Sequence, residues 1–333
     1  MNIGINGFGR VGKHICKAIL ESNSDLNIIQ INDITDTKTL AHLFKYDSCY
    51  GVFPGEISYD ENSITINNKK ISISTERDPS KIVWNEKIDT IIESTGFFTD
   101  ATKASLHIRD NVKRVIITAP SKGVDITIIM GINEKDFDPY KHKTISNASC
   151  TTNSLAPAVK VLNDNYQIEK GFMTTVHAYT NDQKILDAPH DDLRRARAGA
   201  INIIPTTTGA AKAVSLVIPE MEGRITGIAL RVPTPVVSIT DFVCLVKKQT
   251  TKEDVNNAFL EASQKSLKGI LGFTMEPIVS SDVKGSPFSG IIDGLSTMVL
   301  DGNFIKIFSW YDNEWAFSVR IADLCKYISE RTN

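Results

Sequence analysis

The first half of the chain alternates short apolar runs with helical or turn-rich stretches. A β-like run at residues 2–6 is followed by a helical pattern whose apolar positions are Val11, Ile15, Ala18 and Ile19. Further β-like runs, all rich in β-branched residues, lie at 27–31, 90–94, 114–118 and 126–130, and a helix-compatible or turn-rich stretch lies at 99–110. This alternation predicts a parallel, doubly wound sheet.

The second half has longer extended runs. They lie at 170–179, 225–232, 237–246 and 304–311 and predict one antiparallel sheet, with helical spacing at 253–267 and 316–327. The predicted fold class is therefore α/β, a Rossmann-type doubly wound parallel sheet plus an α+β domain with a mainly antiparallel sheet. A length of 333 residues exceeds what one core usually organises. We expect one domain at 1–149, joined by a C-terminal helix at 314–333, and a second at 150–313.

A glycine-rich turn follows the first strand. Gly7-Phe8-Gly9-Arg10-Val11-Gly12 has the G-x-G-x-x-G spacing, in which glycines permit a tight turn and close approach of the backbone to a pyrophosphate. Asp33 ends the next strand, about 20 residues further on, where a carboxylate can hold a ribose diol. The pattern predicts a dinucleotide site, and an ordinary turn is the weaker interpretation.

Asp33 also predicts a preference for NAD over NADP. The extra phosphate of NADP would face this carboxylate, and at an effective dielectric near 20 a unit charge about 4 Å away costs about 4 kcal/mol. Arg10 and Arg77 are cations that could compensate this repulsion.

Cys150 is the candidate nucleophile. It stands in Ser149-Cys150-Thr151-Thr152-Asn153, a polar cluster that opens a helix-like run. A helix N-terminus favours the anionic form of a thiol, so we expect a pKa lowered toward about 6 and a thiolate at neutral pH. A buried, inert cysteine is the alternative interpretation.

His177 is the candidate acid or base. It lies in the strand-like run 173–180, and period-two alternation places it on one face with Met173, Thr175 and Tyr179. A single histidine in a strand is usually structural. Together with a nucleophilic cysteine it becomes a plausible general base, although the sequence does not show whether the two side chains meet.

The composition of the chain mainly argues against certain partners, locations and kinds of site. With 37 Lys plus Arg against 39 Asp plus Glu, the net charge of −2 offers no electrostatic reason to expect nucleic acid or an anionic membrane as partner. We find no apolar stretch of about 20 residues and no signal peptide before the first strand, so we expect a cytoplasmic protein. The five cysteines have no C-x-x-C spacing, which predicts neither a disulfide framework nor a metal site.

From end to end the chain resembles the phosphorylating glyceraldehyde-3-phosphate dehydrogenases. The residues that carry the resemblance are Ile5-Asn6-Gly7-Phe8-Gly9-Arg10, Ser149-Cys150-Thr151-Thr152-Asn153, His177-Ala178-Tyr179-Thr180, Thr206-Thr207-Thr208-Gly209-Ala210-Ala211-Lys212, Arg231-Val232-Pro233-Thr234-Pro235 and Trp310-Tyr311-Asp312-Asn313-Glu314-Trp315. The resemblance implies a glycolytic, NAD-dependent oxidoreductase that forms a cysteine hemithioacetal and thioester. It also implies a homotetramer in which a loop at about 178–203 reaches toward a neighbouring subunit.

The resemblance further implies the roles of individual residues. Cys150 and His177 would be catalytic, and glyceraldehyde 3-phosphate and inorganic phosphate would be the substrates. Thr180 and Arg231 would hold the substrate phosphate, and the attacking phosphate would lie against Ser149, Thr151, Thr208, Gly209 and Arg195. Whether Arg194 or Arg195 faces that phosphate is open. The predicted cofactor residues are Gly7, Phe8, Gly9, Arg10, Val11, Asp33, Arg77, Thr118 and Asn313.

Three positions depart from the family pattern. Phe317 replaces a tyrosine, Ala316 a glycine and Val236 an asparagine, and Asn313 is retained to orient the carboxamide. Two other functions stay open. One is an erythrose-4-phosphate dehydrogenase of the same fold, and the other is a binding or adhesion protein, or a nucleic-acid-associated one, that has kept the fold.

Overall fold

The computed structural model describes residues 1–22 and 24–332 and divides into two compact units. Unit 1 contains Met1–Ile128, Glu134–Ala148 and the segment from Ser318 onward, and unit 2 contains Ile129–Asn133 and Ser149–Phe317. Each unit has its own sheet. No helix in the described ranges is long and apolar enough to cross a membrane.

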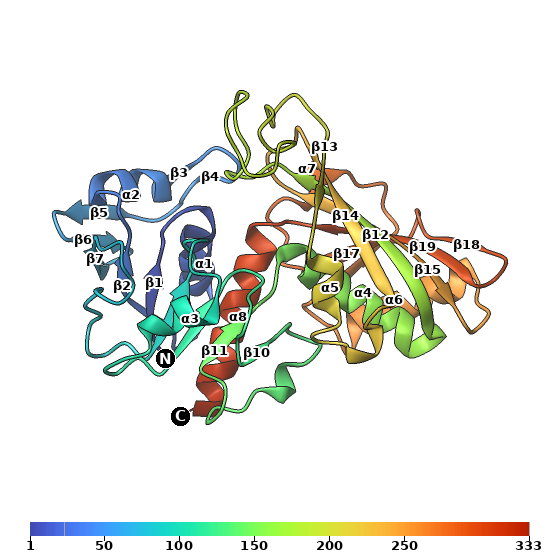
Figure 1. Cartoon of the computed structure of the whole chain (residues 1–333), viewed down its shortest axis with the longest axis horizontal. Helices are drawn as coiled ribbons and strands as arrows, with labels where there is room; N and C mark the ends of the chain where they lie inside the picture. The colour runs from blue at the N-terminus through green and yellow to red at the C-terminus, as the bar shows by residue number, and fades with distance from the viewer. Residues whose placement is uncertain (23, 333) are drawn as a thin grey trace. The chain divides into compact units, whose positions relative to one another are not determined.

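Unit 1 is built on a nine-stranded sheet with the order β10-β11-β9-β8-β1-β2-β7-β6-β5 (Figure 1). Its strands are β1 Asn2–Asn6, β2 Asn27–Asn32, β5 Ile57–Asp60, β6 Ser63–Ile66, β7 Lys69–Ser74, β8 Thr90–Glu93, β9 Arg114–Ile117, β10 Ile126–Thr127 and β11 Thr144–Ser146. The strands from β10 to β7 in this order are parallel. This confirms the doubly wound sheet, although the strand expected at 126–130 ends at residue 127.

The antiparallel edge of this sheet was not predicted. β5, β6 and β7 pair antiparallel, and a separate two-stranded ribbon joins β3 Tyr46–Asp47 to β4 Gly51–Val52. The helices of unit 1 are α1 Arg10–Glu21, α2 Thr37–Lys45, α3 Ala101–Ala104 and the part of α8 (Trp315–Thr332) from Ser318 onward, with 3₁₀ turns η1 Ser105–His107 and η2 Glu134–Asp136.

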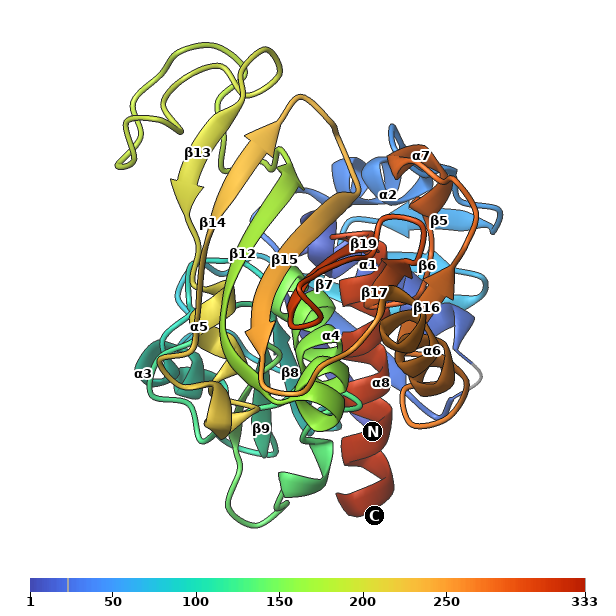
Figure 2. The same cartoon turned by 90° about the vertical axis from the view of Figure 1, so that its right-hand side faces the viewer.

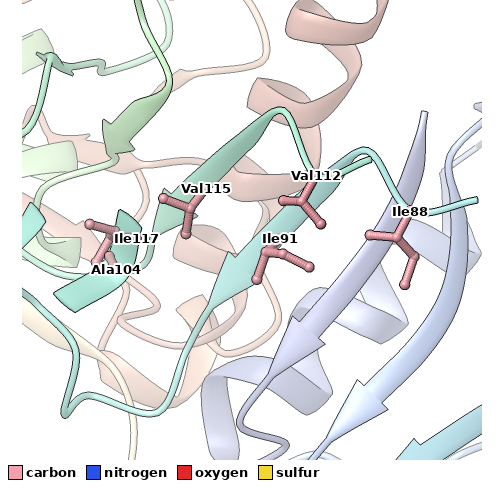
Figure 3. Packing of buried hydrophobic residues seen from close by; sticks show 6 residues of the cluster. All are labelled: Ile88, Ile91, Ala104, Val112, Val115 and Ile117. Atoms are coloured by element: carbon pink, nitrogen blue, oxygen red, sulfur yellow. The ribbon is translucent and has the colours of Figure 1, made fainter. Parts of the chain in front are cut away.

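One hydrophobic cluster packs β8 and β9 against α3. In Figure 3 its side chains form a continuous row, and they are Ile88, Ile91, Ala104, Val112, Val115 and Ile117. All are buried. Near-continuous apolar strands of this kind are expected where a parallel sheet is covered on both faces.

Unit 2 contains an eight-stranded sheet, which is mainly antiparallel as predicted. Its order is β13-β14-β12-β15-β19-β17-β16, and β18 pairs with β19. The strands are β12 Ile168–Ala178, β13 Ile204–Thr207, β14 Ile225–Val232, β15 Ser238–Val246, β16 Leu271–Thr274, β17 Gly290–Asp293, β18 Met298–Leu300 and β19 Phe304–Tyr311. The exceptions are two parallel pairs, β12 with β14 and β16 with β17.

Helices cover one face of this sheet. α4 Cys150–Tyr166 contacts β12, β15, β17 and β19, as Figure 2 shows. The remaining helices are α5 Ala210–Val214, α6 Lys252–Gln264, α7 Ser280–Val283 and the 3₁₀ turn η3 Pro219–Met221. α8 spans Trp315–Thr332, and the last residue of the helix predicted at 314–333 lies outside the described residues.

Candidate functional site

Cys150 is the first residue of α4. Ser149 caps the helix in an extended conformation, and its Oγ accepts a hydrogen bond from the Thr152 N–H at 3.0 Å. A serine at this position satisfies one of the donors that a helix N-terminus leaves unpaired. The half-buried thiol therefore has a fixed place at the start of a rigid helix.

The structure brings Cys150 and His177 together. His177 is the penultimate residue of β12, and its Nε2 lies 3.5 Å from Cys150 Sγ. Its Nδ1 lies 2.7 Å from the carbonyl oxygen of Ala178. The two neighbours of Nδ1 favour opposite tautomers: donation to this carbonyl leaves the lone pair of Nε2 directed at the thiol, whereas acceptance from the Arg231 guanidinium places the proton on Nε2.

Arg231 lies on the adjacent strand β14, in register with His177. Its Nη1 is 2.9 Å from His177 Nδ1 and 3.1 Å from the Ala178 oxygen, to which it donates. Its Nε is buried and has no hydrogen-bond partner in the described structure. A guanidinium with an unused donor is a candidate for binding an oxyanion.

The charge state of the pair differs from the sequence-based expectation. Burial raises the pKa of the Cys150 thiol above its ordinary value, although the charge of Arg231 and hydrogen bonds from Thr151 act in the opposite direction. Burial, and then Arg231, lower the pKa of His177 from 6.5 to about 3. The expected thiol pKa near 6 was wrong, because the loss of water outweighs the helix N-terminus. Both shifts favour the uncharged form, of the thiol in one case and of the imidazole in the other.

Tyr311 forms a wall of the site that the sequence analysis did not single out. Its hydroxyl is 2.8 Å from Thr151 Oγ1 and 2.8 Å from Thr175 Oγ1, and its ring meets His177 edge-on at 6.0 Å. The Thr151 hydroxyl, predicted to contact phosphate, is thus buried against Tyr311. The position of Tyr311 at the end of an alternating strand was the available signal.

A second group of donors gathers at β13. Arg195 Nε donates to Thr206 Oγ1 at 3.0 Å, and its Nη1 forms an ion pair with Asp182 at 2.8 Å. The charge of Arg195 also lowers the pKa of His177, as the smallest of the causes after burial and Arg231. Arg194 instead approaches the Pro205 carbonyl at 3.5 Å.

The remaining predicted anion ligands lie in two loops. Thr208 and Gly209 follow β13, and the Thr208 Oγ1 accepts a hydrogen bond from the Ala210 N–H at 3.2 Å. Gly209 caps α5. Thr180 lies just beyond β12, where its carbonyl accepts from Gln183 N–H at 2.9 Å.

The predicted dinucleotide residues gather in unit 1 at the start of α1. Gly7 has a φ of +90°, and a Cβ there would lie 2.7 Å from the Thr95 nitrogen, whereas a Cβ at Gly12 would lie 2.1 Å from the Gly7 oxygen. Gly9, by contrast, borders open space and caps α1 without a side-chain hydrogen bond. These features fit a pyrophosphate at the helix N-terminus.

Asp33 lies beside this turn. Its Oδ2 accepts from the Phe8 N–H at 2.6 Å and its Oδ1 from the Thr35 N–H at 2.9 Å. Each carboxylate oxygen keeps a second lone pair for a ribose hydroxyl. Arg10, one of the two possible compensating cations, is held by Asp47 at 2.7 Å, and Arg77 is exposed.

The other predicted cofactor residues have different surroundings. Val11 is in the first turn of α1. Thr118 follows β9, and both its N–H and its hydroxyl donate to the Glu93 carbonyl. Asn313 belongs to unit 2, is buried, and accepts from the Ser238 hydroxyl at 3.2 Å.

The three departures from the family pattern are buried apolar positions. Val236, Ala316 and Phe317 are 7%, 2% and 5% exposed. Nothing in the structure explains the loss of the hydroxyl at Phe317.

Family models match both parts of the chain. The model described as glyceraldehyde 3-phosphate dehydrogenase, NAD binding domain, matches residues 1–101, and the corresponding C-terminal domain matches 149–313. Glyceraldehyde-3-phosphate dehydrogenase of Priestia megaterium is 53% identical, and that of Geobacillus stearothermophilus 52%, each over 99% of both chains. The chain belongs to the glyceraldehyde-3-phosphate dehydrogenase family. A Bacillus subtilis member, glyceraldehyde-3-phosphate dehydrogenase 1, is 52% identical over the same share.

Membership of the glyceraldehyde-3-phosphate dehydrogenase family confirms the resemblance seen in the sequence and the NAD-binding character of the first domain. The N-terminal match includes the glycine turn and Asp33, and the C-terminal match begins at Ser149 and ends at Asn313. All predicted site residues except Thr118 therefore lie inside matched segments.

Proposed function

We propose that this chain oxidises glyceraldehyde 3-phosphate with NAD and transfers the resulting acyl group to inorganic phosphate. The observation that carries the proposal is the thiol–imidazole pair of Cys150 and His177, 3.5 Å apart beside the buried guanidinium of Arg231. Family membership supplies the substrate and the cofactor. The geometry supports the roles of the individual side chains.

The reaction begins at Cys150. His177 Nε2 takes the thiol proton as Sγ forms a bond to the aldehyde carbon, and returns it to the carbonyl oxygen, which becomes the hydroxyl of a hemithioacetal. The backbone N–H of Cys150, together with the imidazole, is a suitable donor to the developing oxyanion. A positioned general base of this kind contributes about 10²- to 10⁴-fold to the rate.

Oxidation converts the hemithioacetal to a thioester. Bound NAD supplies the hydride acceptor for this step. His177 accepts the hydroxyl proton as the carbon loses its hydride, so two electrons and two protons leave in total and the thioester carbonyl forms. Inorganic phosphate then attacks this carbonyl, the bond to Sγ breaks, and an acyl phosphate leaves with the energy of the thioester conserved.

Two anions must be held during this sequence. We assign the substrate phosphate to Arg231 and Thr180, because the Arg231 Nε donor is buried and unused in the described structure. We assign the attacking phosphate to Ser149, Thr151, Thr208, Gly209 and Arg195. Between the two candidate arginines we favour Arg195, since its charge acts on His177 whereas the Arg194 guanidinium approaches Pro205.

We also propose a homotetramer in the cytoplasm, with residues 1–149 and the helix at 314–333 binding NAD and residues 150–313 carrying the chemistry. The loop at 178–203 exposes large apolar side chains, among them Ile185 at 87% and Leu193 at 82%. Exposed apolar groups of this density are typical of an interaction surface. Light scattering on the purified protein would test the tetramer.

The decisive experiment compares two aldehydes. Initial rates with glyceraldehyde 3-phosphate and with erythrose 4-phosphate are measured with NAD, in the presence and absence of inorganic phosphate. We expect higher catalytic efficiency with the three-carbon substrate and sustained turnover that requires phosphate. Higher efficiency with erythrose 4-phosphate, or full turnover without phosphate, would refute the proposal.

A further inference from the structure

A row of polar side chains, buried except for the half-buried Ser74, crosses the carboxyl ends of four neighbouring parallel strands in unit 1. Glu93, Asn6, Asn32 and Ser74 end β8, β1, β2 and β7 and are paired in register. Asn6 Nδ2 donates to Glu93 Oε2 at 2.6 Å, Asn32 Nδ2 donates to Asn6 Oδ1 at 2.8 Å, and Ser74 Oγ donates to Asn32 Oδ1 at 3.0 Å. Every bond in the row therefore points toward Glu93.

Glu93 is a carboxylate, as a count of its donors shows. Thr95 donates to Oε1 from its N–H at 2.8 Å and from its hydroxyl, while Asn6 and His107 lie against Oε2 at 2.6 and 3.1 Å. A carboxylate accepts at about four lone-pair sites, and all four are used. Glu93 is 2% exposed, so its charge is tolerated because these donors replace water.

Trp84 fixes the other side of this arrangement. Its indole N–H, which can only donate, lies 3.2 Å from His107 Nδ1. Nδ1 must therefore accept, and a neutral imidazole then carries its proton on Nε2, facing Glu93. His107 is fully buried, so water is not available to exchange these partners. Trp84 and Glu93 together lock one tautomer of His107.

The row lies where a nucleotide is expected. The strand order turns at β1, with β2 on one side and β8 on the other, and ligands of doubly wound sheets bind outside the carboxyl ends at such a point. Asn32 directly precedes Asp33 and holds both the N–H and the carbonyl of Glu76. Glu93 is thus linked by hydrogen bonds to Asn32, through Asn6, at the end of β2 and to Thr95 just after β8, on the two sides of β1.

We propose that Glu93 is a positioning residue for NAD. Its buried charge orients Asn6, Asn32 and Thr95, whereas Trp84 fixes only which ring nitrogen of His107 carries the proton. The inference rests on the proposed function only in taking NAD as the ligand. Glu93→Gln replaces one carboxylate oxygen, which accepts hydrogen bonds, by an NH₂ group, which donates them. This group faces the donors of Asn6 and His107, so the hydrogen bonds of the row can no longer all point toward residue 93.

The test is the dissociation constant of NAD, measured by calorimetry without substrate. We expect Glu93→Gln to weaken NAD binding on the order of 10-fold, since each buried donor left without an acceptor is costly. Trp84→Phe alone should change binding less than about 2-fold. In the double variant His107 is free to move its proton to Nδ1 and accept from the new amide, so much of the lost affinity should return.

Controls separate positioning from general destabilisation. Val115→Ala, in the cluster of Figure 3, lowers the stability of the same sheet without touching the row, and it should leave the dissociation constant of NAD unchanged. Asn32→Ala should weaken NAD binding without rescue by Trp84→Phe. Should Glu93→Gln not fold, Asn32→Ala with and without Trp84→Phe still tests the positioning role. So does ¹⁵N NMR of His107 in the wild type, where the Nε2–H tautomer is expected.

Each outcome has one meaning. A wild-type protein that does not bind NAD refutes the proposed function. If the wild type binds NAD, then unchanged affinity in Glu93→Gln or, where that variant does not fold, in Asn32→Ala overturns the positioning role. Four other results also overturn it. Two concern Trp84→Phe: simple additivity of its effect with that of Glu93→Gln, and rescue of Asn32→Ala. The others are an equal loss of NAD affinity in Val115→Ala and an Nδ1–H tautomer of His107.

Discussion

Replacing Arg231 by methionine should raise the pKa of His177. In the structure the Arg231 Nη1 lies 2.9 Å from His177 Nδ1, and the pKa of His177 falls from 6.5 to about 3. That depression corresponds to about 5 kcal/mol against the imidazolium. It arises first from burial and second from the guanidinium charge.

The size of the effect follows from these contributions. At an effective dielectric near 20, two unit charges 2.9 Å apart repel by about 6 kcal/mol, an upper limit because both charges are spread over several atoms. Burial is the larger cause and remains in Arg231→Met. We therefore expect the pKa of His177 to rise by about 1 to 2, which is about 1.4 to 2.7 kcal/mol, without returning to 6.5.

The assay is a pH titration of labelled histidine by NMR. His177→Asn identifies the signal, and Arg194→Met serves as the matched control, because that guanidinium approaches the Pro205 carbonyl instead. Thermal unfolding of each variant verifies folding. An unchanged titration of His177 in Arg231→Met, or an equal change in Arg194→Met, would show that the guanidinium does not set the charge state of the pair.

Four further results are expected. Cys150→Ser should abolish turnover while NAD binding stays within a few-fold, because a serine hydroxyl is a far weaker nucleophile at neutral pH; a variant that kept a tenth of the activity would remove Cys150 as nucleophile. Asp33→Ala should narrow the preference for NAD mainly by improving NADP binding, and equal efficiency with both cofactors in the wild type would contradict its role. Thr208→Ala should raise the Michaelis constant for phosphate and leave the pre-steady-state burst of NADH intact, so a lost burst would move Thr208 to another step. Finally, His14 and His177 both have a pKa near 3 in the folded chain, so the unfolded chain takes up protons first as the pH falls below 6.5. The unfolding free energy should then drop by up to about 1.4 kcal/mol per pH unit for each histidine. Thermal unfolding measured between pH 7 and 5 checks this, and an equally strong pH dependence of stability in His14→Gln and the wild type would contradict it.

Local patterns in the sequence determined the outline of the protein. Apolar periodicity and the glycine turn were sufficient for the parallel sheet, and Ser149 marked the start of the helix that carries Cys150. These features depend on residues close together in the chain, where propensity and capping act directly. The hairpin edge of β5 to β7 was missed because its short strands carry a weak alternating pattern.

Only the tertiary structure decided the chemistry of the site. Cys150 and His177 are 27 residues apart, and Arg231 is 54 residues beyond His177, so their contacts depend on how β12, β14 and α4 pack. The expected pKa of the thiol was wrong for the same reason. A helix N-terminus can be recognised in a sequence, whereas the removal of water from a side chain is the sum of contacts from many distant residues. The row that ends at Glu93 is likewise visible only once the carboxyl ends of four strands lie side by side.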